Sequence, residues 1–228
     1  MTDIAQHPKV KLVSYSKPTV DYQLQGLENV QDLIAYCAKV SNPSNQINKE
    51  TSERLIKYLI EHQHWSPLEM VNACLEINTT RDIAHQIVRH RSFSFQEFSQ
   101  RYADPTTMED WYEMREARLQ DVKNRQNSLD TDDMELQIEW FKKQGEVQQA
   151  AERAYQWAID NDIAKEQARV VLPQNTYTSW IWTGSLYAFS RVCNLRCQPD
   201  AQLETQEICW EIDKLSNDKF PVSWEALR

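Results

Sequence analysis

Alternating apolar and polar positions predict three strands. Residues 10–16 alternate until Pro18 ends the run. Residues 70–79 place apolar side chains on one face, and residues 177–182 are rich in aromatic and β-branched side chains. Because successive side chains of a strand point to opposite faces, we expect the strand over residues 70–79 to be half-buried.

Apolar residues at three- and four-residue spacing predict helices in the rest of the chain. The expected helices cover residues 29–40, about 51–61, a segment beginning at 79–82, 111–124, 133–160, 164–172, about 183–195 and about 201–215. The longest would bury a stripe of Trp140, Phe141, Val147, Ala151 and Tyr155. The pattern predicts an α+β fold, a mixed central sheet flanked by helices. We expect a single domain over residues 1–228, with about 105–160 as a variable, mostly helical section.

The stretch from residue 89 to residue 102 carries the densest candidate chemistry. Gln86, Arg89 and His90 would share one face of the helix that precedes it. If the segment after Arg91 is extended, Glu97, Ser99 and Arg101 would point the same way. We expect these groups to converge on a polar pocket for a phosphate and a planar ring, because arginine pairs with phosphate at two points.

A purely structural interpretation of the same stretch stays open. Arg89, His90 and Arg91 would also complement the negative end of a helix dipole, an effect of about 0.3–1 kcal/mol, with Arg101 simply solvated. That interpretation leaves the alternating glutamate, serine and arginine unexplained.

The composition narrows the possible ligands. A net charge of −9 argues against an RNA-binding module, so we expect a small anion rather than a nucleic-acid polymer. Three scattered glycines exclude a glycine-lined nucleotide cradle, and no metal-binding spacing occurs. Five cysteines, with no apolar run of membrane length and no signal-peptide pattern in residues 1–6, predict free thiols in the cytoplasm and no membrane partner.

The sequence resembles the flavin-dependent thymidylate synthases. Arg89, His90 and Arg91, then seven residues, then Ser99, match the signature of that family. Residues 62–69 resemble its upstream block, and residues 168–173 and 194–196 resemble its downstream blocks. Four ordered blocks are far more specific than one short motif. The resemblance covers most of residues 51–202, with a weaker middle. It implies the fold of that family over the whole chain.

The resemblance implies reductive methylation of dUMP to dTMP. The carbon would come from 5,10-methylenetetrahydrofolate and the hydride from reduced FAD, which NADPH recharges. It implies that Arg196 is catalytic, as a fixed cation beside the uracil ring. The implied substrate-binding residues are Gln86, Arg89, Glu97, Ser99, Arg101, Arg169, Arg196 and His64. The implied cofactor-binding residues are Ser66, Glu69, Arg89, His90, Arg91, Glu97, Ser185, Tyr187 and Arg191. The resemblance also implies a homotetramer with sites shared between subunits.

Some residues depart from the family pattern. Ser185 and Tyr187 stand where some members have Asn and Arg, and Arg191 stands where Asn occurs, so the adenine end of the flavin would be held differently. We expect Ser99 to bind rather than to attack, because no base is adjacent to it. The alternative function is a nucleotide-binding protein without redox chemistry that uses the same arginines.

Overall fold

The computed structural model describes residues 9–108 and 110–228. The start of the chain, residues 1–6, for which we predict no signal peptide, lies outside the described residues. Within the described part, no helix is long and apolar enough to cross a membrane.

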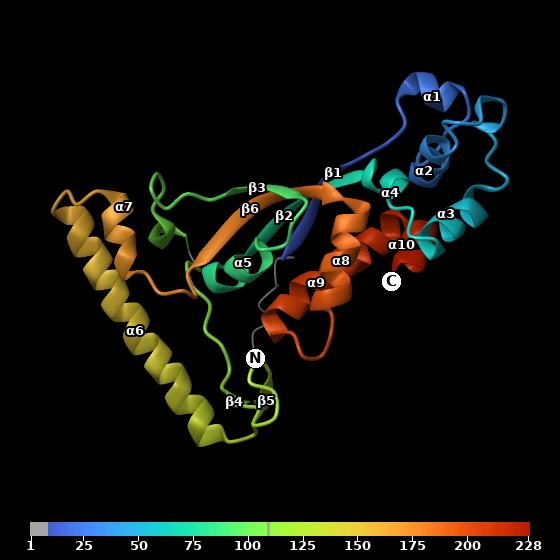
Figure 1. Ribbon diagram of the computed structural model, residues 1–228. Helices are drawn as coiled ribbons and strands as arrows, with labels where there is room; N and C mark the ends of the chain where they lie inside the picture. Colours follow the sequence, from blue (N-terminus) through green and yellow to red (C-terminus); the bar gives the residue numbers. More distant parts are fainter. Residues whose placement is uncertain (1–8, 109) are drawn as a thin grey trace.

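A four-stranded antiparallel sheet forms the centre of the structure (Figure 1). Its strands, in spatial order, are β1 (Val10–Tyr15), β2 (Asn72–Thr80), β6 (Tyr177–Ser185) and β3 (Phe93–Glu97). A separate hairpin consists of β4 (Arg118–Gln120) and β5 (Ser128–Asp130). The three predicted strands are confirmed, and the segment after Arg91 that was considered as extended contains β3. The short strands β4 and β5 were not predicted.

The α+β class is confirmed, but the sheet is not mixed. Each of its three pairings is antiparallel. The two strands β2 and β3 run in the same direction, because both pair antiparallel with β6. Since β6 lies between them, they never become parallel neighbours.

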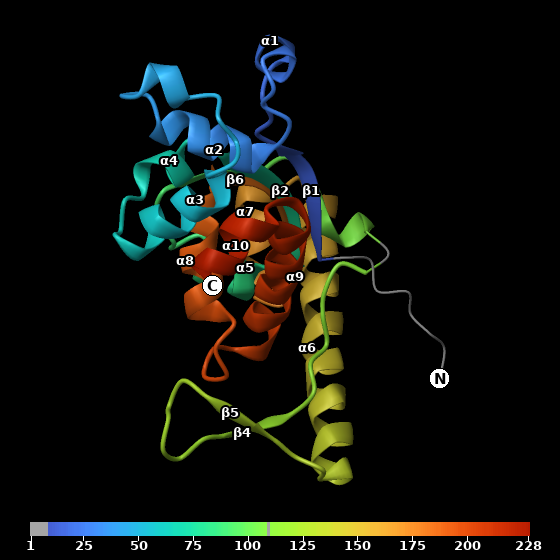
Figure 2. The same ribbon diagram turned by 90° about the vertical axis from the view of Figure 1, so that its right-hand side faces the viewer.

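Helices cover the sheet and one long helix leaves it. The helices are α1 (Val20–Leu24), α2 (Val30–Ala38), α3 (Ser52–Glu61), α4 (Ser66–Glu69), α5 (Arg81–Ile87), α6 (Met134–Asp160), α7 (Lys165–Ala168), α8 (Leu186–Arg196), α9 (Leu203–Lys219) and α10 (Pro221–Leu227). Short 3-10 turns occupy Pro43–Asn45, Pro105–Thr107 and Arg169–Val171. Figures 1 and 2 show α5, α8 and α9 against the sheet, while α6 stands apart from it.

The core lies between the sheet and its covering helices. Trp180 and Trp182 of β6 and Phe189 of α8 are almost fully buried there. Phe93 packs its ring on Trp182, with 4.3 Å between ring centroids, and on Phe189 at 4.9 Å. A Cβ atom on Gly184 would lie 2.3 Å from the Phe93 ring, so this position of β6 accepts only glycine without rearrangement.

The prediction of a helix over 111–124 is wrong. The backbone N–H of Tyr177 donates to the carbonyl of Trp111, and that of Glu113 donates to the carbonyl of Asn175. These bonds hold the segment extended beside residues 175–177 and thus prevent helical bonding. Between this segment and the next predicted helix, Ser128–Asp130 form β5.

The helix predicted over 133–160 is confirmed as α6, but its predicted apolar stripe is only partly buried. Ala151 and Tyr155 are buried, whereas Trp140, Phe141 and Val147 are 42%, 38% and 56% exposed. The C-terminal half of α6 packs against the segment around α7. The N-terminal half is instead hydrogen-bonded through Gln137 and Gln144 to residues 115–117, which leaves these apolar side chains exposed.

The start of α8 also differs from the prediction. The strand β6 continues through Thr183 to Ser185, and Ser185 rather than Thr183 caps the helix. Its Oγ accepts a hydrogen bond of 3.1 Å from the N–H of Ala188, as a serine at a helix start commonly does.

Candidate active site

The ends of α5 and α8 meet at Arg196 and His90. Arg196 lies in the last turn of α8, and His90 lies in the turn after α5. The Nε of Arg196 donates to Nε2 of His90 over 3.1 Å. An imidazole can accept this bond only when that nitrogen carries no proton. Burial, together with the nearby Arg196 and Arg191 guanidinium groups, lowers the pKa of His90 to about 4, so the ring is neutral at pH 7.

A cavity of about 680 Å³ surrounds this pair. It is lined by Gln86, Arg89, His90, Gln126, Leu195, Arg196, Asp200, Ala201 and Gln202. The helix α5 ends at Ile87, so Arg89 and His90 do not continue its face as predicted. The turn after the helix nevertheless brings Gln86, Arg89 and His90 to one cavity.

Gln86 is held in place from α9. Its Nε2 donates to Oε1 of Gln202 over 2.5 Å, and its Oε1 accepts a longer bond from Thr205. Neither Gln202 nor Gln126 was predicted as a site residue. Gln202 follows a turn 116 residues after Gln86, so no local spacing could have indicated the pair.

Arg89 and Arg91 flank His90 and are both exposed. The next residue, Ser92, has φ +73°, a left-handed conformation that costs free energy for a residue other than glycine. This turn reverses the chain from α5 into β3. It therefore fixes the positions from which the side chains of Arg89 and Arg91 extend into solvent.

Glu97, Ser99 and Arg101 do not form the predicted alternating row. The strand β3 ends at Glu97, and the chain turns at Ser99, whose carbonyl accepts from the N–H groups of Tyr102 and Ala103. The backbone is not extended after Glu97, because these hydrogen bonds close a turn. The three side chains therefore have separate environments.

Glu97 is the most fixed of these three side chains. Its Oε1 accepts from Thr178 Oγ1 over 2.9 Å and lies 3.7 Å from Arg81 Nη1. Arg101 forms a solvent-exposed ion pair of 3.3 Å with Glu166 of α7. Exposed pairs of this kind contribute about 0–1 kcal/mol, so an incoming anion could replace the carboxylate. Arg169 lies in the 3-10 turn directly after α7 and is half-buried.

A second group of predicted residues lies where α4 meets α8. Ser66 and Glu69 are exposed on α4, and Arg191 is exposed on α8. The Trp65 ring stacks on the Tyr187 ring with 4.4 Å between centroids.

Other predicted residues of this region are placed differently. His64 follows α3, is exposed, and lies edge-on to Tyr58. Ser185 is buried with its hydroxyl engaged in the cap of α8. Its oxygen is therefore committed as the cap acceptor, and only the O–H hydrogen is left to donate.

The predicted residues form two groups at opposite ends of the sheet within one chain: Glu97, Ser99 and Arg101 lie near Thr178, and the residues of α4 and α8 lie near Ser185. Thr178, which holds Glu97, and Ser185, which begins α8, are separated by seven positions along β6. At about 3.3 Å per residue this is roughly 23 Å. A ligand that touches both groups must span that length or meet one of them on another subunit.

The guanidinium groups of the site fit an anionic cofactor such as FAD. Gly26 lies before α2, Gly145 is inside α6, and the space beside Gly184 is filled by Phe93, so no glycine is left for a backbone phosphate cradle. Among the described residues, Arg89, Arg91 and Arg191 have no carboxylate partner in an ion pair. These side chains can therefore supply the positive charge that a pyrophosphate needs. The described residues contain no cluster of His, Cys, Asp and Glu that could hold a metal ion.

A partly buried ion-pair cluster near α5 was not predicted. Asp82 accepts from Arg115 Nη1 over 2.5 Å, and Thr80 Oγ1 accepts from Arg115 Nη2 over 2.6 Å. Although burial acts in the opposite direction, the bonds from Arg115 and Thr80 lower the pKa of the Asp82 carboxyl. The cluster ties the start of α5 to the segment before β4. The sequence did not identify Asp82 as part of an ion pair, because an acidic residue is also expected in the first turn of a helix.

Comparison with known proteins identifies the family of this chain. A model of the thymidylate synthase complementing protein family (Thy1) matches residues 22–222. A protein of Synechocystis sp., named flavin-dependent thymidylate synthase, is 44% identical over 219 residues, which cover 96% of this chain and 98% of the relative. A protein of Paramecium bursaria Chlorella virus 1, named probable flavin-dependent thymidylate synthase, is 41% identical over 217 residues, covering 95% and 97%. A Kosmotoga olearia flavin-dependent thymidylate synthase is 34% identical over 189 residues, covering 83% and 81%. With a matching family model over most of its length and relatives at this identity, the chain belongs to the thymidylate synthase complementing protein family.

Proposed function

We propose that this chain is a flavin-dependent thymidylate synthase, a methyltransferase that converts dUMP to dTMP. It uses 5,10-methylenetetrahydrofolate as carbon donor, FAD as cofactor and NADPH as reductant. The names of relatives that match nearly the whole chain support this activity. They do not support the alternative of a nucleotide-binding protein without redox chemistry.

The observation that carries the proposal is the cavity in which Arg196, His90 and Gln86 meet. Reduced FAD, when bound, supplies a hydride, and the uracil ring that accepts it gains negative charge on its oxygen and nitrogen atoms. Arg196 stabilises that charge, because a guanidinium stays protonated even when half-buried. Its Nε is engaged by neutral His90, so the Nη groups remain to face the ring.

The dUMP phosphate needs several donors, and we assign these to Gln86, Ser99, Arg101 and Arg169. Gln86 is positioned by Gln202, and Ser99 and Arg101 belong to the turn after β3. Arg101 would exchange its exposed Glu166 partner for the phosphate. Ser99 acts as a hydrogen-bond donor, because the imidazole of His90 is committed to Arg196 and is not available to it as a base.

We assign the flavin to the exposed arginines and to the α4–α8 contact. Arg89, His90 and Arg91 would hold it at one side, and Glu97 would contact both flavin and nucleotide. Ser66, Glu69, Tyr187 and Arg191 would hold it at the other side. The Ser185 hydroxyl is already used by the cap of α8, which makes it the weakest member of the set.

We also propose a homotetramer in which sites are shared between subunits. The separation of the two residue groups along β6 supports this, because a second chain could bring them together. The exposed apolar side chains of α6 support it as well. Sedimentation velocity with and without FAD tests the assembly. The cytoplasmic location stays a prediction.

The activity is tested by oxidation of NADPH in the presence of dUMP and methylenetetrahydrofolate, with and without added FAD. We expect oxidation that depends on both FAD and dUMP, with dTMP detected as product. Protein that takes up no FAD and forms no dTMP would contradict the proposal.

A further inference from the structure

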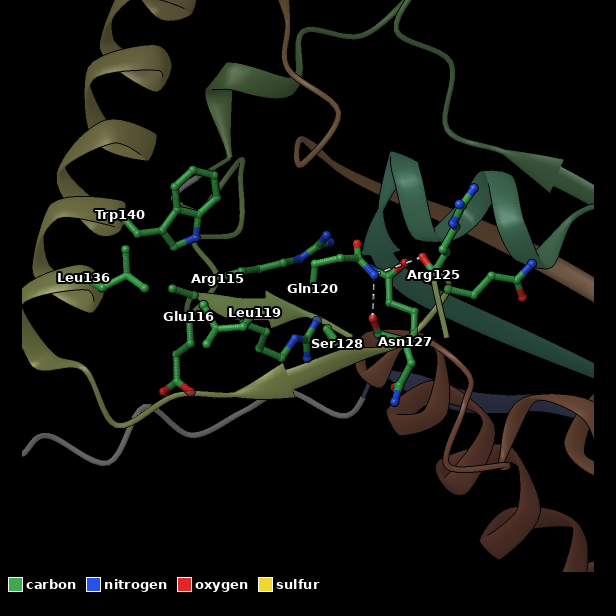
Figure 3. A pocket seen from close by; sticks show the side chains of 13 residues that line it. Arg115, Glu116, Leu119, Gln120, Arg125, Asn127, Ser128, Leu136 and Trp140 are labelled. Carbon is green, nitrogen blue, oxygen red and sulfur yellow. Dashed lines mark hydrogen bonds between the residues drawn. The ribbon is translucent and has the colours of Figure 1, made fainter. Parts of the chain in front are cut away.

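A second cavity, of about 530 Å³, adjoins the one around Arg196. The β4–β5 hairpin and α6 form its walls (Figure 3). Gln126 of the hairpin loop and Gln202 before α9 line both cavities. A ligand in the first cavity can therefore extend past these two amides into the second.

The hairpin is tied to the site by a chain of hydrogen bonds. Arg118 of β4 donates to Glu204 over 2.5 Å, and Glu204 accepts from Gln202 over 2.8 Å. Gln202 in turn accepts from Gln86, the predicted substrate ligand, over 2.5 Å. The side chains of Arg118 and Glu204 are only 16% and 10% exposed, so water competes weakly for this pair. The hairpin is thus held at a defined distance from the substrate position.

The loop of the hairpin is also ordered from within. Gln120 Nε2 lies 3.1–3.2 Å from the carbonyls of Asp121, Arg125 and Asn127. These bonds fix the backbone that presents Arg125. A ligand that binds Arg125 therefore orders only its side chain, which lowers the entropic cost of binding.

The two ends of the second cavity differ in chemistry. Figure 3 shows Leu136 and Trp140 at the α6 end and Arg125 at the opposite end. The Arg125 end also has Gln126, Asn127 and Ser128, and it adjoins the first cavity because Gln126 is shared.

The charge of the Arg125 end is positive and uncompensated. Arg115 and Arg118 are paired with carboxylates, but Arg125 has no ion-pair partner among the residues that the structure describes. The acidic lining residue Glu116 lies at the α6 end in Figure 3. This end of the cavity therefore suits an anion that leaves the first cavity.

We propose that Arg125 and the polar hairpin loop bind the glutamyl tail of the folate co-substrate. The inference rests on the proposed function, in which 5,10-methylenetetrahydrofolate is the carbon donor. The tail is flexible, carries a carboxylate on each glutamate, and must leave the reacting ring toward solvent. An unpaired guanidinium with amide and hydroxyl donors at the edge of the cavity recognises such carboxylates. The phosphates of NADPH are a second source of the same negative charge, and the experiment separates the two.

The test compares Arg125→Gln with Lys123→Gln. Lys123 is an exposed cation of the same loop that lines neither cavity, so its substitution removes the same charge beside the site. Protein loaded with FAD and dUMP is titrated calorimetrically with tetrahydrofolate carrying one glutamate or three. This folate lacks the transferable carbon, so binding is measured without turnover. Unchanged melting temperatures show that both variants fold.

We expect the unsubstituted protein to bind the triglutamate more tightly than the monoglutamate. Arg125→Gln should weaken triglutamate binding by about threefold to tenfold and remove most of that preference, because a charge-assisted contact is lost. Lys123→Gln should retain the preference. The KM for NADPH should stay unchanged in both variants.

Three results would overturn the inference. The ratio of the two affinities could be the same in Arg125→Gln as in the unsubstituted protein, or Lys123→Gln could lose the preference equally. Alternatively, Arg125→Gln could raise the KM for NADPH and leave folate binding unaltered, which would assign the cavity to the dinucleotide phosphates. Failure of the proposed function is distinguishable, because the unsubstituted protein would then form no dTMP.

Discussion

The Nε atom of Arg196 donates a hydrogen bond to Nε2 of His90 across 3.1 Å, although 106 positions separate the two residues in the chain. The bond fixes the direction of the guanidinium, because His90 is an acceptor only while its ring is neutral. The signature histidine thus orients the cation, and need not act as an acid or a base.

His90 is expected to titrate far below an ordinary histidine. Its folded pKa is about 4, because burial and the Arg196 and Arg191 charges oppose the imidazolium. An unfolded histidine, with a pKa near 6.5, binds a proton at higher pH. The resulting contribution to the free energy of unfolding is complete above pH 6.5 and is lost as pH falls toward 4. Two-dimensional NMR of the imidazole gives the pKa, and urea unfolding at several pH values gives the stability.

The matched variants for this prediction are His90→Gln and His85→Gln. His85 is exposed on α5 and lines neither cavity. The loss of stability between pH 6.5 and 4 should become smaller in His90→Gln and persist in His85→Gln. A His90 midpoint above pH 6 would disprove the assignment.

Arg196→Lys keeps the positive charge but loses the planar fork that binds His90 and that we propose also faces the substrate. We expect kcat to fall by about 10²- to 10³-fold, the usual effect of removing a donor aimed at developing charge. The KM for dUMP should change much less, since the phosphate is held elsewhere. Steady-state kinetics of dTMP formation measure both constants. Arg54→Lys, an exposed arginine on α3, is the control, and equal losses in both variants would rule out a special role for Arg196.

Ser99→Ala tests whether this hydroxyl binds or attacks. If Ser99 only donates to the phosphate, the KM for dUMP should rise by about tenfold while kcat stays within a few-fold. A nucleophile would show the opposite pattern, with dUMP affinity intact and turnover abolished. Calorimetric binding of dUMP and single-turnover kinetics separate these cases.

Gly184→Ala should destabilise the protein, because the added Cβ would meet the Phe93 ring at 2.3 Å. Overpacking of this kind costs about 1–3 kcal/mol. Gly145→Ala is the matched control. Its Cβ would lie 3.8 Å from Met114 Cε, and alanine favours a helix such as α6, so stability should rise by up to about 1 kcal/mol.

Thermal unfolding measures both glycine variants. Adding Phe93→Leu to Gly184→Ala should restore part of the loss, because the smaller side chain vacates the contact. Equal melting temperatures for Gly184→Ala and the unsubstituted protein would show that the sheet adapts without cost.

The sequence predicted those elements whose structure follows from local pattern. Alternation located β1 and β2, and Asn29 with Asp32 forms the capping box that starts α2. The prediction of a helix over 111–124 was wrong, because backbone hydrogen bonds join residues 111–113 to residues 175–177, far away in the chain. The prediction of a fully buried stripe along α6 was wrong for a related reason. Helical spacing identifies an apolar stripe but not what covers it.

The candidate site could be predicted only in part. Helical spacing indicated Gln86, Arg89 and His90 as neighbours, and Arg196 came from the family resemblance alone. The residues that hold them, Gln202 among them, depend on tertiary contacts that no spacing encodes. Arg101 and Glu97 were expected to share one side of an extended segment, but the turn at Ser99 separates them.

The hydrogen bonds that run from Gln86 through Gln202 and Glu204 to Arg118 have a consequence for protein engineering. Exchanging the hairpin with that of a relative is not a neutral loop graft. A transplanted hairpin without an arginine at this position would leave the buried Glu204 carboxylate with only its longer 3.9 Å contact to Arg115, and would loosen Gln202, which positions Gln86. Grafts are therefore expected to succeed only when the glutamate and the arginine travel together.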